Sequence, residues 1–179
     1  MQNIKAYIML VCASLFWAGN FMVGKYAFLT EIPPLSLVFY RWSLVWIILL
    51  PFTYKEIIKH QDTILTDLPL LFFLGLTSVG LFNSFTYLSL IHTQVINASL
   101  FNTAIPAIII LLCFLFKIEK TNKFQILGLI ISAGGIIAII TKLKLDILLS
   151  LNFNKGDLIM IGGVITWGVY STLLKKKQF

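Results

Sequence analysis

The chain has 179 residues, of which 59% are hydrophobic and only 12% are charged. Soluble domains carry about 25% charged residues, so this composition excludes an ordinary water-soluble domain, and the high hydrophobicity excludes a disordered chain. The formal net charge of +7 then bears on membrane orientation rather than on nucleic-acid binding, because basic residues of membrane proteins gather in their loops. The composition predicts a multi-pass protein of the lipid bilayer.

Charged segments divide the chain into six apolar runs of 17 to 24 residues. About 17–25 helical residues cross the hydrocarbon layer of a bilayer. Lipid offers no partner to backbone N–H and C=O groups, so such spans are predicted to be α-helices. The expected fold class is all-α, a polytopic bundle of transmembrane helices. The six predicted spans are Ala6–Gly24, Pro33–Phe52, Leu68–Ile91, Val95–Phe116, Phe124–Thr141 and Leu158–Leu174.

A secretory signal peptide is the alternative interpretation of the first run. Its apolar stretch is long for a signal peptide and contains Trp17 and Asn20. No small-x-small cleavage site follows it cleanly. We therefore interpret Ala6–Gly24 as a membrane span.

The distribution of lysines predicts the orientation of the spans. Six crossings place both termini on one side of the membrane. With the N-terminus inside, the inner segments carry nine lysines and the outer loops four. Cytoplasmic loops carry the excess of basic residues, so both termini are expected in the cytoplasm and the protein in the inner (plasma) membrane.

An internal repeat relates the first span to the last. A shift of 150 residues aligns two lysines and one tryptophan with residues of the same type. The aligned pairs are Lys5 with Lys155, Trp17 with Trp167, and Lys25 with Lys175. The repeat unit then has five helices, so a second copy would enter from the opposite face, as in inverted-repeat transporters. We expect a five-helix repeat over residues 1–145, and a loop and the first helix of a second repeat over 146–179.

A series of short motifs follows the spans in order. They are Trp17-Ala18-Gly19-Asn20-Phe21, Pro33-Pro34, Arg41, the segment from Asn97 to Pro106, the Gly-rich stretch Gly128–Gly135, and Lys155-Gly156-Asp157. In this order they resemble the EamA-type domain of the drug/metabolite transporter superfamily. The resemblance implies metabolite transport without a bound cofactor. It also implies ten helices in two repeats, so a second chain supplying the missing helices is an expected partner.

Helical phase gathers polar and aromatic side chains on four faces. In span four, for example, Ser99, Asn102 and Thr103 share one face with Pro106, and this proline is expected to interrupt the helix. A central cavity lined by spans one, three, four and six is predicted to bind a small molecule. Its candidate residues are Trp17, Asn20, Asn83, Tyr87, Ser99, Asn102, Thr103, Trp167 and Tyr170.

Each candidate also has a structural interpretation. Polar side chains in membrane helices often bond a neighbouring helix, and tryptophans often anchor at the membrane interface. Arg41, the one formal charge deep in a span, either serves the structure or attracts an anionic group. Lys25, at the outer end of span one, is expected to be solvated.

The positions of the acidic residues restrict the charge of the expected substrate. All seven lie in loops or at span ends, whereas a lipophilic cation in a dry cavity needs a counter-charge. The sequence therefore favours a transporter of small neutral, zwitterionic or anionic metabolites by alternating access. No enzyme motif and no metal-ligand spacing is present. A non-transporting membrane subunit or an inactive truncated remnant is the alternative.

Overall fold

The computed structural model describes residues 2–119, 122–141, 143 and 154–177, and within them the regular structure is helical throughout. The expectation of an all-α bundle is confirmed. The elements are α1 (Gln2–Leu29), α2 (Pro34–Lys59), α3 (Gln61–Thr66), α4 (Leu68–Gly75), the π-helical turn η1 (Leu76–Leu81), α5 (Phe82–His92), α6 (Val95–Asn102), α7 (Ile105–Leu115), α8 (Lys123–Thr141) and α10 (Lys155–Lys177).

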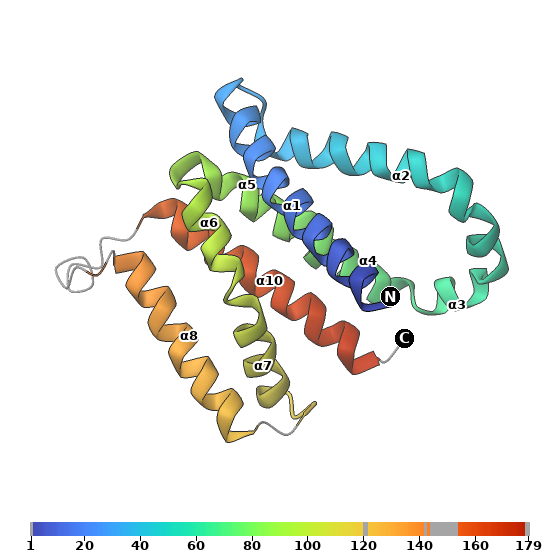
Figure 1. Ribbon diagram of the computed structural model, residues 1–179. Coiled ribbons are helices and arrows are strands. Elements are labelled where there is room, and N and C mark those ends of the chain that lie inside the picture. Colours follow the sequence, from blue (N-terminus) through green and yellow to red (C-terminus); the bar gives the residue numbers. More distant parts are fainter. Residues whose placement is uncertain (1, 120–121, 142, 144–153, 178–179) are drawn as a thin grey trace.

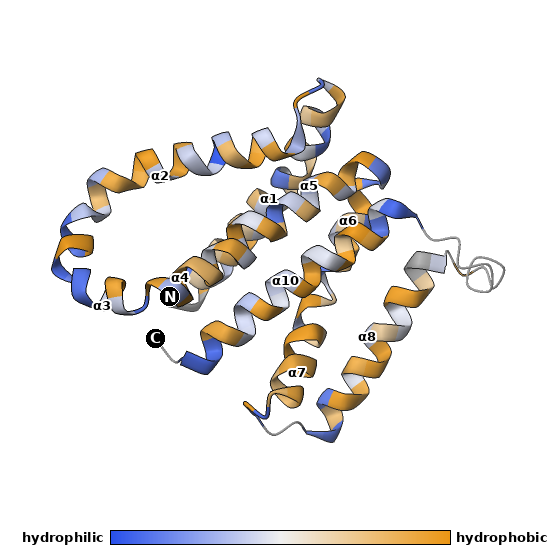
Figure 2. Ribbon diagram, turned by 180° about the vertical axis from the view of Figure 1, so that it is seen from behind, coloured by the Kyte–Doolittle hydropathy of each residue, from blue (hydrophilic) through white to orange (hydrophobic). Residues whose placement is uncertain are grey.

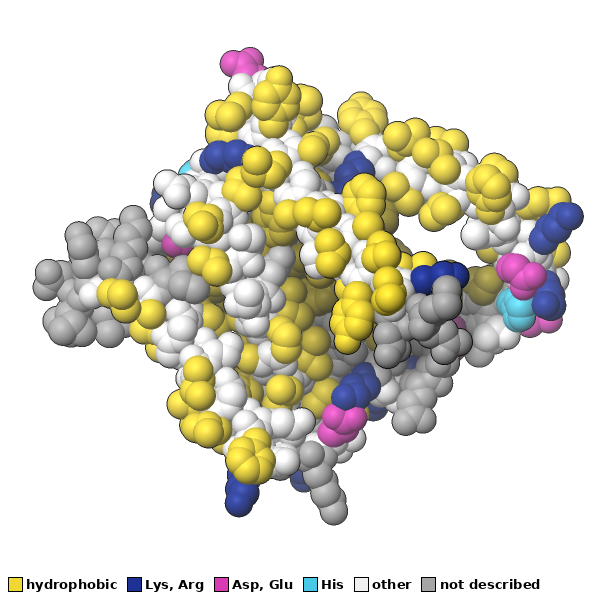
Figure 3. Space-filling view, in the orientation of Figure 1, with side chains coloured by type: hydrophobic (Ala, Val, Ile, Leu, Met, Phe, Trp, Pro, Cys, Tyr) yellow, Lys and Arg dark blue, Asp and Glu magenta, His cyan; other side chains and the backbone are white. Residues whose placement is uncertain are grey.

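Among the described residues, five helical stretches are long and apolar enough to cross a membrane. They are Ile4–Leu29, Pro34–Lys59, Leu68–His92, Val95–Leu115 and Lys155–Lys177. The predicted fifth span coincides with α8, whose apolar stretch Lys123–Ala138 is shorter. Hydrophobic residues make up most of the length of the helices, and hydrophilic residues gather toward the helix ends (Figure 2). Hydrophobic side chains cover much of the face shown in Figure 3. This distribution suits a bundle surrounded by lipid.

The third span is a helix with a π-helical turn in its middle. Here α4 continues through η1 into α5, and the Phe82 N–H bonds the Thr77 carbonyl five residues back. The wider turn shifts carbonyls away from the α-helical pattern. The Asn83 amide donates to two of them, Ser78 O at 3.1 Å and Val79 O at 3.0 Å.

The fourth span is broken, as Pro106 predicts. Helix α6 ends at Asn102 and α7 begins at Ile105, with Pro106 in its first turn. Between them, Thr103 N–H and Ala104 N–H bond carbonyls three residues back, each at 3.0 Å. A proline ring clashes with the carbonyl four residues before it, and this clash removes the α-helical bond at the break.

Polar contacts join the loops at each end of the bundle. At one end, Lys175 pairs with Glu119 at 2.6 Å and Lys177 pairs with Asp67, and both termini lie at this end (Figure 1). At the other end, Lys25 Nζ donates to Leu90 O at 2.6 Å and to Thr93 O at 3.2 Å. The expectation that Lys25 is solvated was wrong, because it caps the carbonyl end of α5.

Helix α10 runs through the middle of the bundle, against α5 and α7 (Figure 1). Its N-terminus docks on the end of α5, where Thr93 Oγ1 donates to the buried Asp157 Oδ1 at 2.6 Å. Gly156 and Gly163 allow this approach: a Cβ atom at Gly163 would lie 3.3 Å from Phe85 Cβ. Small residues let membrane helices pack closely.

Candidate functional site

A cavity of about 320 Å³ lies where α1, α2, α10 and the η1–α5 segment meet. Polar groups and aromatic rings line it together. The lining residues are Trp17, Asn20, Arg41, Trp42, Ser78, Val79, Phe82, Asn83, Trp167 and Tyr170. Its volume falls within the roughly 300–1,000 Å³ of small-molecule sites.

Three polar side chains from three helices meet at the wall of this cavity. Arg41 Nη1, on α2, donates to Asn20 Oδ1 on α1 and to the Tyr87 hydroxyl on α5. The Tyr87 hydroxyl in turn donates to Asn20 Oδ1 at 2.6 Å. Tyr87 is only 2% exposed, so the cluster holds Arg41 in a fixed position.

The Arg41 guanidinium keeps unused donors. An arginine has five N–H groups, and the hydrogen bonds of Arg41 within the described part of the chain engage Nη1 alone. Among the described residues no carboxylate pairs with it. The guanidinium lies over the Trp42 ring, 5.4 Å from its centroid, which stabilises the cation without neutralising it. The remaining N–H groups can bind a carboxylate or another anionic group.

A glycine on α1 makes room for the buried tyrosine. A Cβ atom at Gly24 would lie 2.7 Å from Tyr87 Cδ1 and Cε1. Gly24 therefore allows the Tyr87 ring to pack against the α1 backbone, one turn from Asn20. The close packing of α1 and α5 sets the distance between the Asn20 amide and the Tyr87 hydroxyl.

Aromatic rings form the opposite wall. The centroid of Trp167 lies 6.1 Å from that of Trp17, 4.7 Å from Phe82 and 5.2 Å from Tyr170. These tilted arrangements are the favourable ones for aromatic pairs. Trp17 and Trp167, which the 150-residue shift aligns, are thus in contact. Each of the two tryptophans therefore has a protein partner, which an interface anchor does not need.

Asn83 lines the cavity but is occupied by the helix. Its Nδ2 donates to two carbonyls of the π-helical turn, and its side chain is buried. The amide therefore stabilises η1, and its part in the cavity is to shape the wall.

The structure places the span-four candidates away from this cavity. Ser99 Oγ donates to Ile96 O at 2.8 Å, and the exposed Thr103 donates to Leu100 O at 2.6 Å. Asn102 Oδ1 is buried without a partner among the described residues. Ser99 and Asn102 lie on α6, and Thr103 lies in the break that follows it. None of the three lines the cavity, because α6 does not border it. Helix α2 supplies Arg41 and Trp42 instead.

No group of three or more His, Cys, Asp or Glu side chains that could hold a metal lies within the part of the chain that the structure describes. The chemistry of the cavity is therefore that of its guanidinium, its amide and hydroxyl groups, and its aromatic rings.

Comparison with known proteins identifies the family. The EamA-like transporter family matches residues 4–141, most of the chain. The chain belongs to this family. An uncharacterised transporter of Archaeoglobus fulgidus is 32% identical over 178 residues, and the uncharacterised transporter YyaM of Bacillus subtilis is 27% identical over 176. A WAT1-related protein of Arabidopsis thaliana is 25% identical over 143 residues.

The alignments cover nearly all of this EamA-like chain but only part of its relatives. They span 98% of the chain and 59% of the archaeal protein, and 97% of the chain and 56% of the Bacillus protein. The chain thus spans little more than half the length of these relatives. The plant alignment covers 75% of the chain and 38% of the relative. No solved structure matches the chain.

Proposed function

We propose that this EamA-like protein moves small metabolites across the cytoplasmic membrane by alternating access, and that the Arg41 cavity is its substrate site. The observation that carries the proposal is the guanidinium of Arg41, held by Asn20 and Tyr87 with N–H groups left over. Ionisable residues inside membrane spans mark substrate pathways. Of the neutral, zwitterionic and anionic classes, the geometry favours a substrate with an anionic group.

The charge of the cavity also argues against cations. Its lining contains Arg41 and no acidic side chain. A cationic substrate would meet a like charge at close range without a compensating carboxylate, which is unfavourable in a low-dielectric site. Cationic compounds are therefore the poorest candidates.

The contact between the repeat-related tryptophans supports a two-repeat architecture. Trp17 and Trp167 meet at the cavity, and inverted-repeat transporters bind substrate where their repeats meet. We infer a first repeat over residues 1–145, with 146–179 beginning a second. Further helices, in the same or a second chain, would complete the other side of the cavity.

A non-transporting membrane subunit is the second candidate function. It would use the same Arg41 cavity to bind a small molecule. Transport by alternating access moves one repeat against the other. A subunit that binds substrate without moving it would act together with a partner protein that supplies the other repeat.

Efflux from proteoliposomes separates the two functions. Vesicles holding the protein are loaded with equal concentrations of anionic, zwitterionic and cationic metabolites, and efflux is followed by mass spectrometry. We expect anions or zwitterions to leave faster than from empty vesicles, with cations retained. Selective efflux of cations would contradict the assigned charge preference. An absence of efflux for every compound would favour the subunit.

The orientation of the bundle is tested with reporter fusions. Fusions of a phosphatase that is active only outside the cytoplasm are made after Lys59, Thr93, Lys117 and Lys175. The excess of lysine predicts activity at Thr93 alone. Activity at Lys117 would contradict the proposed cytoplasmic side, as would inactivity at Thr93.

Two substitutions distinguish the cavity from the helix break. Tyr87→Phe keeps the ring but removes the hydroxyl that bonds Arg41 and Asn20, so substrate flux should fall several-fold at normal membrane abundance. Asn102→Ala removes an oxygen outside the cavity and should leave flux per molecule unchanged. Equal loss of flux in both variants, at equal abundance, would contradict the placement of the site.

A further inference from the structure

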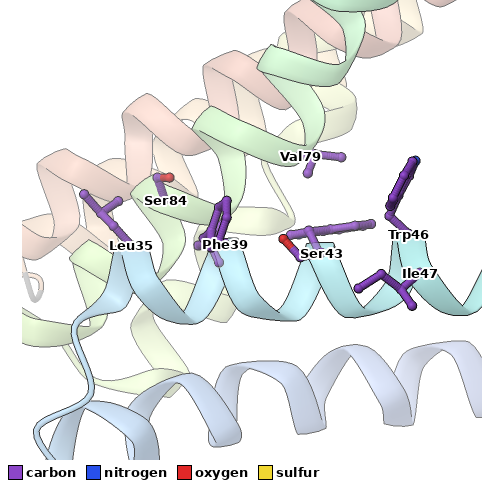
Figure 4. A pocket seen from close by; sticks show the side chains of 9 residues that line it. Leu35, Phe39, Ser43, Trp46, Ile47, Val79 and Ser84 are labelled. Atoms are coloured by element: carbon purple, nitrogen blue, oxygen red, sulfur yellow. The ribbon is translucent and has the colours of Figure 1, made fainter.

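A second hollow adjoins the Arg41 cavity on the side of α2. It has a volume of about 650 Å³ and runs between α2 and the η1–α5 segment. Figure 4 shows Phe39, Ser43, Trp46 and Ile47 along the α2 side of this groove. Trp42 and Val79 line both the groove and the Arg41 cavity. The two hollows therefore meet at these two side chains.

The two hollows differ in chemistry. The cavity carries the guanidinium and amides, whereas the groove is lined by apolar side chains except for Ser43 and Ser84. The groove also opens sideways: Phe39 is 67% exposed and Trp46 is 63% exposed. The surface is hollowed beside α2 (Figure 3). In a membrane this opening faces hydrocarbon.

We propose that the site binds a single-chain anionic amphiphile. Its anionic head contacts Arg41 in the cavity, and its apolar tail passes Trp42 and Val79 to lie along α2 in the groove. This inference rests on the proposed function and names the substrate class of the same site. The charge complementarity of the head and the two side chains that border both hollows, Trp42 and Val79, carry it.

The position of Arg41 favours a ligand with a single acyl chain over a two-chain phospholipid. Arg41 lies seven residues beyond Pro34, about 10 Å along the helix, so a bound head group must leave the membrane surface. The cavity of about 320 Å³ also holds the rings of Trp17 and Trp167 in its walls. A compact head such as a carboxylate fits this space, and one apolar chain fills one groove.

The tryptophans provide a direct reporter. The chain has four; Trp17, Trp42 and Trp167 line the cavity, and Trp42 and Trp46 line the groove. Bromine quenches indole fluorescence on contact, so a brominated ligand reports occupancy of either hollow.

The experiment titrates 12-bromododecanoate into the protein in phosphatidylcholine nanodiscs. We expect saturable quenching that unlabelled dodecanoate reverses. The affinity should fall at least tenfold in Arg41→Gln, and 12-bromododecyltrimethylammonium, with the same tail and the opposite charge, should not quench saturably. Non-saturable quenching by the carboxylate, or equal saturable quenching by the cation, would overturn the proposal.

A matched pair on α2 tests the tail without touching Arg41. Ser43→Phe fills the groove, whereas Leu44→Phe adds the same ring at an exposed neighbour outside the lining. Ser43→Phe should weaken bromododecanoate at least tenfold but leave short-chain 4-bromobutanoate unchanged, and Leu44→Phe should change neither. Equal effects of the two variants on bromododecanoate would place the tail elsewhere.

Three further outcomes distinguish a failure of this inference from a failure of the proposed transport. In the first, the nanodisc contains dibrominated phosphatidylcholine. If this lipid quenches the tryptophans and dodecanoate does not relieve the quenching, a membrane phospholipid occupies the groove and the inference is overturned. Saturable dodecanoate binding without its efflux from proteoliposomes would support the inference and contradict the proposed transport. Efflux of short hydrophilic anions without dodecanoate binding would leave transport intact and overturn the inference.

Discussion

Replacing Arg41 with glutamine should sharply reduce transport at low substrate concentration while the protein remains in the membrane at near-normal abundance. Glutamine retains a polar side chain that can still bond Asn20 or Tyr87, but it removes the positive charge. Truncating one partner of a buried charged pair costs about 2–5 kcal/mol of binding free energy. That range corresponds to at least about a thirtyfold rise in the substrate concentration needed for half-maximal flux.

Two controls identify the cause of this loss. Lys59→Gln removes the same charge from the exposed end of α2 and should leave flux within experimental error. Arg41→Lys keeps the charge but replaces the planar fork by a single ammonium, so flux should be partly restored. Normal flux in Arg41→Gln at normal abundance would mean that the arginine serves the structure alone.

Gly156→Ala should destabilise the protein by separating α10 from α5. The new Cβ would lie 2.6 Å from Ser89 O and 2.8 Å from Thr93 N. Both atoms belong to the backbone, so no side-chain rotation relieves the clash, and α10 must shift away from α5. Overpacking costs typically about 1–3 kcal/mol, and this shift also strains the buried bond between Thr93 and Asp157.

Gly162→Ala is the matched control on the same helix. Its Cβ would meet the Phe85 ring at 3.6 Å, an ordinary contact, and alanine favours a helix more than glycine does. Thermal unfolding in detergent, followed by size-exclusion chromatography, should show a midpoint several degrees lower for Gly156→Ala only. Equal midpoints for wild type and both variants would contradict the docking of α10 on α5.

The sequence predicted the long helices of the bundle and the interruption of span four, but not the π-helical turn in span three. Length and hydropathy located the long helices because lipid forces each span to satisfy its own backbone bonds. Pro106 indicated the interruption of span four, because a proline ring clashes with the carbonyl four residues before it in a helix. The π-helical turn of span three has no comparable local sign. Leu76–Leu81 contains Thr77, Ser78 and Gly80, but small and hydroxyl residues are also common in regular membrane helices, and the Asn83 bonds that accompany the turn depend on the fold.

The candidate site was predicted in part, for a physical reason. Trp17, Asn20, Asn83, Trp167 and Tyr170 line one cavity, and Tyr87 bonds the arginine beside it. Helical phase predicted the cavity-facing residues of spans one, three and six, because the candidates of each span lie within one unbroken helix, α1, α5 or α10. For Ser99, Asn102 and Thr103, helical phase predicts a shared face but not which face borders a cavity. The cavity lies beside α2 instead, and that follows from the packing of the helices. Arg41 stood out as a charge in a span, but its partners lie on other helices, and only packing reveals them.

The most direct test of an Arg41-centred substrate site is protection of single cysteines. Cys12 and Cys113 are replaced by alanine, and one cysteine is introduced at Ser78, which lines the cavity, or at Ser99, which does not. The rate of labelling by a water-soluble thiol reagent is measured with and without a saturating anionic compound taken from the efflux screen. The compound should slow labelling at Ser78→Cys and leave labelling at Ser99→Cys unchanged. Protection at Ser99→Cys with none at Ser78→Cys would contradict the site.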